Sequence, residues 1–220
     1  YLVSYLAGKK YIILSNEGSA NEATVIGTNI NHQYSKTYEF ECDFNNYTKK
    51  YLCKNIYYFS FLRPLSELQI ANIFSDLKKY HYVFRSCNVG SKKDNWVWCC
   101  NCAKCLFVYI VLSPFLSRDE LISIFGCDLY EKEELLDTFI ELLGYKDAKP
   151  FECVGTYIES RYAVSLVIKK YGDDDLPYLL KYYKDHFNLE FTYVNTYNEE
   201  NNLPHEFSDI LKGVLKDYDR

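Results

Sequence analysis

The 220-residue sequence predicts an α/β fold with a partial parallel-sheet core, a four-cysteine zinc knuckle and a mostly helical C-terminal half. Three observations predict it. The short apolar run Tyr11–Leu14 (YIIL) is typical of a strand buried on both faces of a parallel sheet. Four cysteines lie at metal-site spacing within residues 87–105, and helical patterns dominate after residue 115. We therefore expect an α/β part with the zinc knuckle at residues 1–115 and a mostly helical part at 116–220.

Composition and charge exclude several classes of protein. Hydrophobic residues make up 48% of the chain and charged residues 25%, without an apolar run close to membrane-spanning length, which indicates a globular chain. The net charge of −5 argues against a general nucleic-acid binder, because such proteins normally carry a basic face. We expect no nucleic-acid and no membrane partner, and the sequence does not indicate an oligomeric state.

The first elements place a polar loop after a buried strand. An opening apolar helix is expected to end at Gly8, a natural residue for a helix C-terminus, and the strand 11–14 follows. The polar loop 15–22 comes directly after it. Because ligands of open α/β sheets bind outside the carboxyl ends of the strands, this loop is where we expect chemistry.

The next segments are less uniform. Residues 37–43 fit either an edge strand or a helix start, and both interpretations stay open. Residues 57–62 form another apolar stretch, and residues 64–79 predict a helix with Ser66 as its N-cap.

Helical signals continue through the second half. Ser117 and Glu120 fit a capping box that opens a helix at 121–125, and an acidic amphipathic helix is expected at 131–143. A loop bounded by Pro and Gly occupies residues 149–156. Further helical patterns cover residues 160–170, 176–187 and 208–218.

The cysteine cluster predicts a metal site. Four thiolates can enclose a tetrahedral zinc ion, and tight C-x2-C turns hold the required geometry. The expected ligands are Cys87, Cys99, Cys102 and Cys105, with Cys100 as a bystander. An iron–sulfur cluster would also take four thiolates and ranks second, while nine cysteines make a disulfide framework a poor fit. Simple burial suits three isolated cysteines instead: Cys42, Cys53 and Cys127.

Two polar segments are candidate ligand sites. Loop 15–22 offers Glu17 and Glu22 as carboxylates, together with Asn21, and the segment 31–36 adds His32 and Lys36. Histidine titrates near neutrality, and lysine pairs with phosphate or carboxylate groups. The alternative, that both segments simply face solvent, stays open.

The loop 149–156 places Glu152 beside Cys153. Either side chain can serve as a general base when its pKa is shifted towards neutrality. The alternative is that Cys153 is a small buried filler, which the residues alone favour.

These motifs, in this order, resemble the bacterial UDP-N-acetyl-α-D-muramoyl-L-alanyl-L-glutamate epimerases (MurL). The strings that carry the resemblance are YIILSNEGSANE at 11–22, INHQYSKTYEFE at 30–41, FRSCNVG at 84–90, WCCNCAKC at 98–105 and KPFECVGT at 149–156. The resemblance extends to about residue 160, and nothing from Tyr162 onward is diagnostic.

The resemblance implies a fold, a reaction and cofactors. The fold would be a PP-loop nucleotide-binding domain with a structural Zn²⁺ site. The activity would be that of an isomerase in peptidoglycan biosynthesis: ATP and Mg²⁺ activate the terminal L-Glu of UDP-MurNAc-L-Ala-L-Glu as an acyl-adenylate, and the α-carbon is then inverted to give D-Glu. The partner would be this small-molecule substrate, and the location would be cytoplasmic, which also suits reduced thiols.

The resemblance also assigns residues. His32 and Cys153 would be the acid/base pair, with Glu152 beside them, and Lys36 would contact a phosphate or carboxylate. The substrate-binding set would be Glu17, Asn21, Glu22, Gln33, Ser35 and Lys36. Two features depart from the family pattern. Gly18 stands where many relatives have Arg, and the phosphate-binding S-G-G-x-D-S loop is expected upstream of Tyr1, so the chain is expected to be an incomplete enzyme on its own.

Two other functions remain open. A PP-loop enzyme could instead modify a nucleobase or tRNA, although the acidic charge counts against tRNA. A non-catalytic, zinc-stabilised interaction domain would leave the polar loops exposed and divergent. An enzyme predicts that residues 15–22, 32–36 and 152–153 converge on one cleft.

Overall fold

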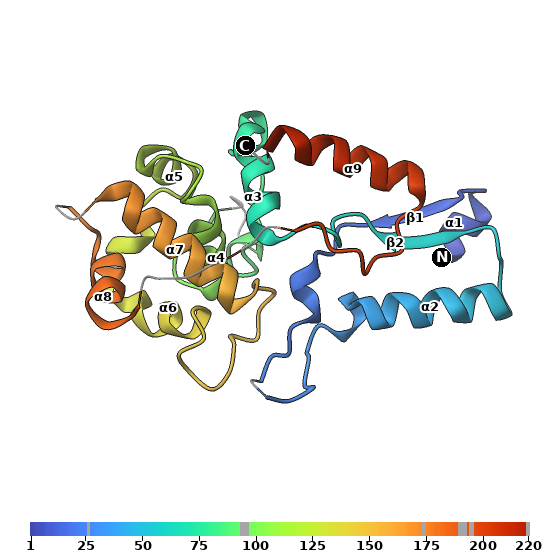
Figure 1. Ribbon diagram of the computed structural model, residues 1–220, viewed down its shortest axis with the longest axis horizontal. Helices are drawn as coiled ribbons and strands as arrows, with labels where there is room; N and C mark the ends of the chain where they lie inside the picture. The colour runs from blue at the N-terminus through green and yellow to red at the C-terminus, as the bar shows by residue number, and fades with distance from the viewer. Residues whose placement is uncertain (26, 93–96, 173–174, 189–192, 194–195, 219–220) are drawn as a thin grey trace. The chain divides into compact units, whose positions relative to one another are not determined.

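A computed structural model describes residues 1–25, 27–92, 97–172, 175–188, 193 and 196–218 (Figure 1). The chain forms two compact units. Unit 1 comprises Tyr1–Glu22, Asn31–Ile70 and Asn195–Arg220, and unit 2 comprises Ala23–Ile30 and Ala71–Val194. This division differs from the boundary after residue 115 that the sequence predicts.

Unit 1 is built on a pair of parallel strands. Strand β1 (Tyr11–Leu14) pairs with β2 (Tyr57–Ser60), with Tyr11 opposite Tyr57 and Leu14 opposite Ser60. The predicted strand and its parallel pairing are confirmed, and within the described part of the chain the sheet has these two strands. The expected burial on both faces is wrong: no residue of β1 is fully buried, and Ile13 is 49% exposed, because β2 pairs with β1 on one edge only. The expected helix before β1 is α1 (Leu2–Leu6), and Gly8 follows it with a left-handed φ of 62°.

Helices cover both faces of this sheet. The connection between the strands contains α2 (Tyr38–Tyr51), so the undecided segment 37–43 is the start of a helix. The Phe44 ring of α2 lies 4.7 Å from that of Tyr58, whereas Phe207 of α9 (His205–Tyr218) lies 5.0 Å from Phe59. Neighbouring strand residues point to opposite faces, so α2 and α9 pack on opposite sides, as Figure 1 shows.

Helix α3 (Glu67–Asp76) has the predicted N-terminal cap. The Ser66 hydroxyl accepts a hydrogen bond from the Gln69 backbone N–H at 3.1 Å, and the Gln69 side chain accepts one from the Ser66 N–H at 3.0 Å. This reciprocal pair satisfies two backbone donors that the first helical turn leaves open.

Unit 2 is helical and centred on α4 (Ala103–Leu112), eight of whose ten residues are buried. Helices α6 (Leu136–Leu142) and α7 (Tyr157–Tyr171) pack against α4. The predicted capping box is present at the start of α5 (Arg118–Phe125). Helix α8 (Tyr178–His186) also belongs to unit 2. Short 3₁₀ helices are η1 (Gly18–Asn21), η2 (Tyr34–Lys36), η3 (Lys78–Tyr80), η4 (Gly90–Lys92), η5 (Leu129–Glu131) and η6 (Glu133–Leu135).

Two expectations were wrong in detail. The helix predicted at 131–143 is interrupted, because Lys132 is extended (φ −85°, ψ 102°) between η5 and η6 and the α-helix begins only at Leu136. The isolated cysteines expected to be buried, Cys42, Cys53 and Cys127, are all partly exposed. None of the helices in the described ranges has the length and apolar character needed to cross a bilayer.

Candidate functional site

Polar side chains gather where both strands of unit 1 end. Asn16, two residues after β1, donates from Nδ2 to the Ser60 hydroxyl at 3.1 Å, and Ser60 is the last residue of β2. Ser60 donates in turn to Glu41 Oε2 of α2 at 2.5 Å. The carboxyl edge of the sheet therefore carries a buried polar network, as expected for the ligand side of an α/β sheet.

The buried guanidinium of Arg63 joins the two predicted ligand segments. Its Nη1 donates to the Glu17 carbonyl at 2.9 Å, and its Nη2 donates to the Lys36 carbonyl at 2.6 Å. Since these carbonyls belong to loop 15–22 and to segment 31–36, one side chain sets the spacing between the two segments.

An ion pair compensates the buried charge of Arg63. Arg63 Nη2 lies 3.5 Å from Glu41 Oε2, and both side chains are almost fully buried, at 0% and 2% exposure. Asn202, from the segment before α9, donates to Glu41 Oε1 at 2.9 Å. Such hydrogen bonds are what a buried ion pair needs to offset the loss of solvation. Sequence reasoning missed all three residues, and the one local signal is a charged residue directly after the apolar run 57–62.

Loop 15–22 folds onto itself and onto α3. The Ser19 hydroxyl lies 3.4 Å from Glu17 Oε1 and 2.9 Å from Glu67 Oε1, so two carboxylates share one hydroxyl. Asn21 accepts a hydrogen bond from the Tyr38 N–H at the start of α2 at 2.8 Å. Gly18 lies against the Arg63 carbonyl, where an added Cβ would be 3.3 Å from the oxygen. Asn21, predicted to bind substrate, therefore holds the N-terminus of α2. Glu67, which the sequence did not indicate, adds a carboxylate to this loop.

Segment 31–36 is anchored to that loop. Asn31 donates from Nδ2 to the Ala20 carbonyl at 2.8 Å, and its Oδ1 accepts from the Gln33 N–H at 2.7 Å. Lys36 Nζ donates to the Gln33 side chain at 3.3 Å. Gln33 is buried, whereas His32 and Ser35 are exposed. The structure thus brings the predicted substrate-binding residues of both segments, together with His32, into one region of unit 1, where Glu22 is half-buried.

The predicted loop 149–156 belongs to unit 2 and is closed at its base. Buried Lys149 donates from Nζ to the Gly155 carbonyl at 2.8 Å, and Thr156 caps α7 by accepting from the Glu159 N–H at 3.2 Å. The tip presents the Phe151 ring, 72% exposed, next to half-buried Glu152 and Cys153. The predicted acid/base partners, His32 and Cys153, thus fall in different units.

The four predicted metal ligands come together in unit 2. Their sulfur atoms, from Cys87, Cys99, Cys102 and Cys105, all lie within 4.8 Å of one another. The Cys99–Cys105 and Cys102–Cys105 sulfurs are 3.6 Å apart, and the Cys87–Cys102 sulfurs are 3.8 Å apart. Two thiolates bound at about 2.3 Å to a tetrahedral ion lie about 3.8 Å apart, so this donor set fits zinc.

The local backbone also suits a compact four-cysteine site. The Gly90 N–H donates to Cys87 Sγ at 3.1 Å, and an added Cβ at Gly90 would stand 1.6 Å from the Val97 carbonyl oxygen, so the knuckle has no room for a side chain there. Hydrogen bonding with Cys105 lowers the pKa of Cys102 to about 5, whereas burial raises the pKa of Cys99 to about 11, and hydrogen bonding with Cys102 raises the pKa of Cys105. Cys100 lies outside the set: its thiol donates to the Phe125 carbonyl at 3.1 Å, and burial raises its pKa to about 12.

The four-cysteine cluster contacts the loop that carries Glu152 and Cys153. Cys102 is the N-cap of α4 and Cys105 lies in its first turn. Between them, Lys104 donates from its backbone N–H to Glu152 Oε2 at 3.1 Å and from its Nζ to the Cys153 carbonyl. Burial, with a smaller contribution from Cys102, raises the pKa of the Glu152 carboxyl.

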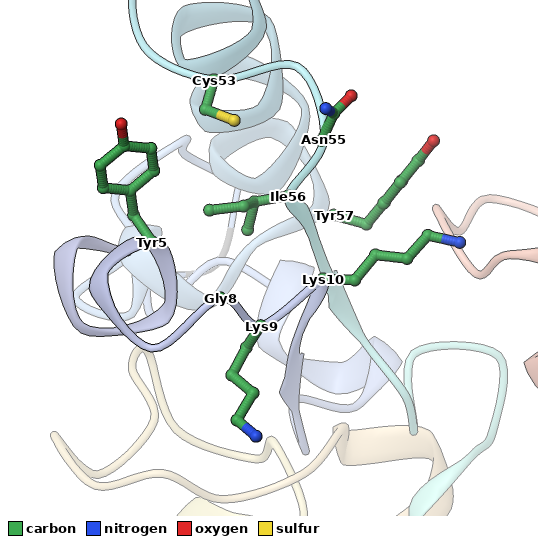
Figure 2. A pocket seen from close by; sticks show the side chains of 8 residues that line it. All are labelled: Tyr5, Gly8, Lys9, Lys10, Cys53, Asn55, Ile56 and Tyr57. Carbon is green, nitrogen blue, oxygen red and sulfur yellow. The ribbon is translucent and has the colours of Figure 1, made fainter.

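Two of the pockets in the described part of the chain lie in unit 1. A pocket of about 450 Å³ is lined by residues at the amino ends of the strands, among them Lys10, Asn55 and Tyr57 (Figure 2). Lys10 Nζ stands 4.8 Å from the centre of the Tyr11 ring. A second pocket, of about 590 Å³, is lined by Leu2, Tyr51 and other apolar side chains. The predicted site residues line neither of these two pockets.

Comparisons with known proteins give a consistent result. Residues 1–61 match a family model described as the MurL N-terminal domain, and residues 83–189 match the MurL C-terminal domain. Similar relatives are named UDP-N-acetyl-alpha-D-muramoyl-L-alanyl-L-glutamate epimerase. They come from Xanthomonas oryzae pv. oryzae (37% identical over 77% of this chain), Micromonospora sp. (39% over 76%) and Salinispora tropica (40% over 79%).

The match covers a minority of each relative. The chain spans 39%, 38% and 39% of the length of these three proteins, respectively. No solved structure matches the chain.

Proposed function

Because the chain belongs to the MurL family, we propose that it takes part in the epimerisation of the terminal L-Glu of UDP-MurNAc-L-Ala-L-Glu to D-Glu, an isomerase reaction that supplies peptidoglycan precursors. The observation that carries this proposal is the match to both MurL domains, together with relatives that carry the epimerase name at 37–40% identity.

The reaction that we propose is ATP-dependent and uses Mg²⁺. An ionised carboxylate makes the adjacent α-proton very hard to remove. Conversion to an acyl-adenylate would cancel that charge and create a better electron sink, after which a base on one face and an acid on the other would complete the inversion. We assign the ATP phosphates to no residue of this chain, whose sequence lacks the S-G-G-x-D-S motif of PP-loop enzymes.

We assign substrate binding to the carboxyl edge of the sheet in unit 1. Lys36, half-buried and held by Gln33, would contact a phosphate or carboxylate of the substrate. Exposed His32 on the same segment would move a proton. The support is the arrangement around Arg63, which holds loop 15–22 and segment 31–36 at a defined spacing.

We assign the second proton-transfer group to the tip of loop 149–156. Glu152 and Cys153 lie there half-buried, and Lys104 holds both. The four cysteines beside this loop would bind a structural zinc ion, since a closed four-thiolate set leaves no open position for substrate. The reaction would take place in the cytoplasm, where thiols stay reduced.

An isotope experiment tests the reaction. The 220-residue protein, loaded with zinc, is incubated with ATP, Mg²⁺ and UDP-MurNAc-L-Ala-L-Glu in D₂O. The product is analysed for α-deuterium, D-Glu, AMP and pyrophosphate. The Xanthomonas oryzae relative provides the positive control. We expect deuterium in the product of the relative, with AMP and pyrophosphate released in equal amounts. We expect this chain, to which we assign no contact with the ATP phosphates, to bind the substrate without turning it over on its own.

Binding is measured separately by calorimetry with the substrate alone. If the relative turns over while the folded, zinc-loaded chain neither reacts nor binds the substrate, the assignment of a substrate site to this chain is wrong. Binding without turnover is the expected result, and turnover by this chain alone would refute the expectation that it is an incomplete enzyme.

A further inference from the structure

We propose that Lys104 couples the metal site to the loop that carries Glu152 and Cys153, so that metal binding by the four cysteines sets the position of these two residues. Lys104 is then a positioning residue, and the metal site has a role beyond holding unit 2 together. The catalytic meaning of this coupling rests on the proposed function, whereas the coupling itself is a property of the fold.

The first step is the place of Lys104 in the chain. It lies between Cys102, which caps α4, and Cys105, which lies in the first turn of that helix. Both neighbours are metal ligands by geometry. An ion that holds their two sulfurs therefore fixes the backbone of the intervening residues, including the Lys104 N–H and the direction of its side chain.

The second step is what Lys104 holds. The N–H groups of a first helical turn have no partner inside the helix, and Glu152 supplies one, with Oε2 at 3.1 Å from the Lys104 nitrogen. The ammonium group of the same residue donates to the carbonyl of Cys153. Lys104 thus binds two successive loop residues. Its backbone N–H binds the Glu152 carboxylate, and its ammonium group binds the Cys153 carbonyl.

The third step concerns the loop itself. Its base is fixed by Lys149 on the Gly155 carbonyl and by the Thr156 cap of α7. The tip between these anchors has no regular secondary structure, and Phe151 there is 72% exposed. A tip of this kind keeps one conformation only as long as side-chain contacts hold it, because ordering each residue costs backbone entropy.

Hydrogen–deuterium exchange measures the coupling without substrate. The readout is the exchange rate of peptide 149–156, in which the Lys149 and Glu152 amides are hydrogen-bonded to the Thr24 and Pro150 carbonyls. Removing metal from the wild-type protein is expected to accelerate this exchange roughly tenfold, the effect of losing charge-assisted hydrogen bonds. Lys104→Met with zinc bound loses the Nζ bond and keeps the backbone bond to Glu152, so it is expected to give part of this acceleration, and subsequent removal of its zinc should add the rest.

The chain offers a matched control and a rescue variant. Lys132 donates from Nζ to the Cys100 carbonyl at 3.0 Å, so Lys132→Met removes the same kind of bond from the same knuckle without touching the loop. It is expected to leave the exchange of peptide 149–156 unchanged. Lys104→Arg keeps a cation that can reach the Cys153 carbonyl and should restore most of the protection, which a general loss of stability would not explain.

Two results would overturn the inference. The first is unchanged exchange of peptide 149–156 in Lys104→Met. The second is loss of zinc from that variant, measured by mass spectrometry, because Lys104 would then act on the metal site and not on the loop. The measurement is independent of turnover: a coupled loop in a protein that does not bind the substrate would refute the proposed function alone, and an uncoupled loop in a protein that binds it would refute only the inference.

Discussion

The network around Arg63 gives the sharpest stability prediction. Replacement of Arg63 by Met removes the donors to the Glu17 and Lys36 carbonyls and leaves the Glu41 carboxylate buried beside an apolar side chain. Breaking a buried ion pair from one side costs about 3–5 kcal/mol, because the remaining charge is uncompensated. For a chain of this length, about 2–4 °C is lost per kcal/mol, so the expected fall in melting temperature is roughly 6–20 °C.

A double variant separates the charge from the contacts. In Arg63→Met combined with Glu41→Met, the unpaired charge is gone, and more than half of the lost stability should return, since replacing both partners of a buried pair is often close to neutral. Arg63→Lys should be intermediate, because one ammonium group cannot take the place of the forked guanidinium on two carbonyls.

Thermal and urea unfolding followed by circular dichroism measure these differences. An Arg63→Met protein within about 1 kcal/mol of wild type would contradict the reasoning, because it would show that Glu41 is not held as a buried charge. A double variant less stable than Arg63→Met would contradict it as well, because the carbonyl contacts and packing would then outweigh the charge.

Three further predictions concern unit 2 and its four-cysteine cluster. The hydrogen bond from the Ser117 backbone N–H, with a second from the Lys78 side chain, lowers the pKa of Glu120 to about 2. A carboxyl with a depressed pKa stabilises the fold above its unfolded pKa of about 4.5, and this contribution is lost as the pH falls towards 2. Glu120→Gln should therefore reduce the decrease in unfolding free energy between these two pH values. An unchanged dependence of the unfolding free energy on pH would count against the cap. Gly90→Ala should lower both the zinc content and the melting temperature, because the new Cβ would overlap the Val97 carbonyl. The control Gly213→Ala, with open space around it in α9, should be neutral or stabilising. Equal effects of the two variants would contradict the close approach of Gly90 to the Val97 carbonyl. Cys105→Ser, or a strong chelator, should remove zinc and lower the melting temperature, whereas Cys100→Ser should keep one zinc ion per chain; zinc loss from the Cys100 variant would place that cysteine in the site.

Local pattern was enough to predict several elements. Strand 11–14 was predicted from its continuous apolar sequence, although its burial on both faces was not met, and the helix stops and caps at Gly8, Ser66 and Ser117 follow from side-chain chemistry within a few residues. The four-cysteine cluster was predicted for the same reason. Close spacing along the chain leaves few ways to arrange four thiols, and the sulfurs do meet.

Segment 37–43 shows where local pattern is insufficient. Its alternation of aromatic and acidic residues suits a strand as well as a helix. Two features decide for the helix: the Thr37 hydroxyl caps α2 by accepting from the Phe40 N–H at 3.1 Å, and Glu41 reaches the buried Arg63. The second feature depends on a residue 22 positions away, which no window along the sequence contains.

The buried network of unit 1 could not be predicted from local pattern at all. Arg63, Glu41 and Asn202 come from three separate segments, and Asn202 lies in a stretch where the sequence offered nothing diagnostic. The family match itself ends at residue 189, yet the segment after it supplies Asn202 to the network and Phe207 to the sheet. A parallel strand needs cover on both faces, and α9 provides it on the face that α2 leaves open. The C-terminal segment is therefore part of what holds loop 15–22 and segment 31–36 in place, which gives residues 196–218 a structural reason to accompany the site.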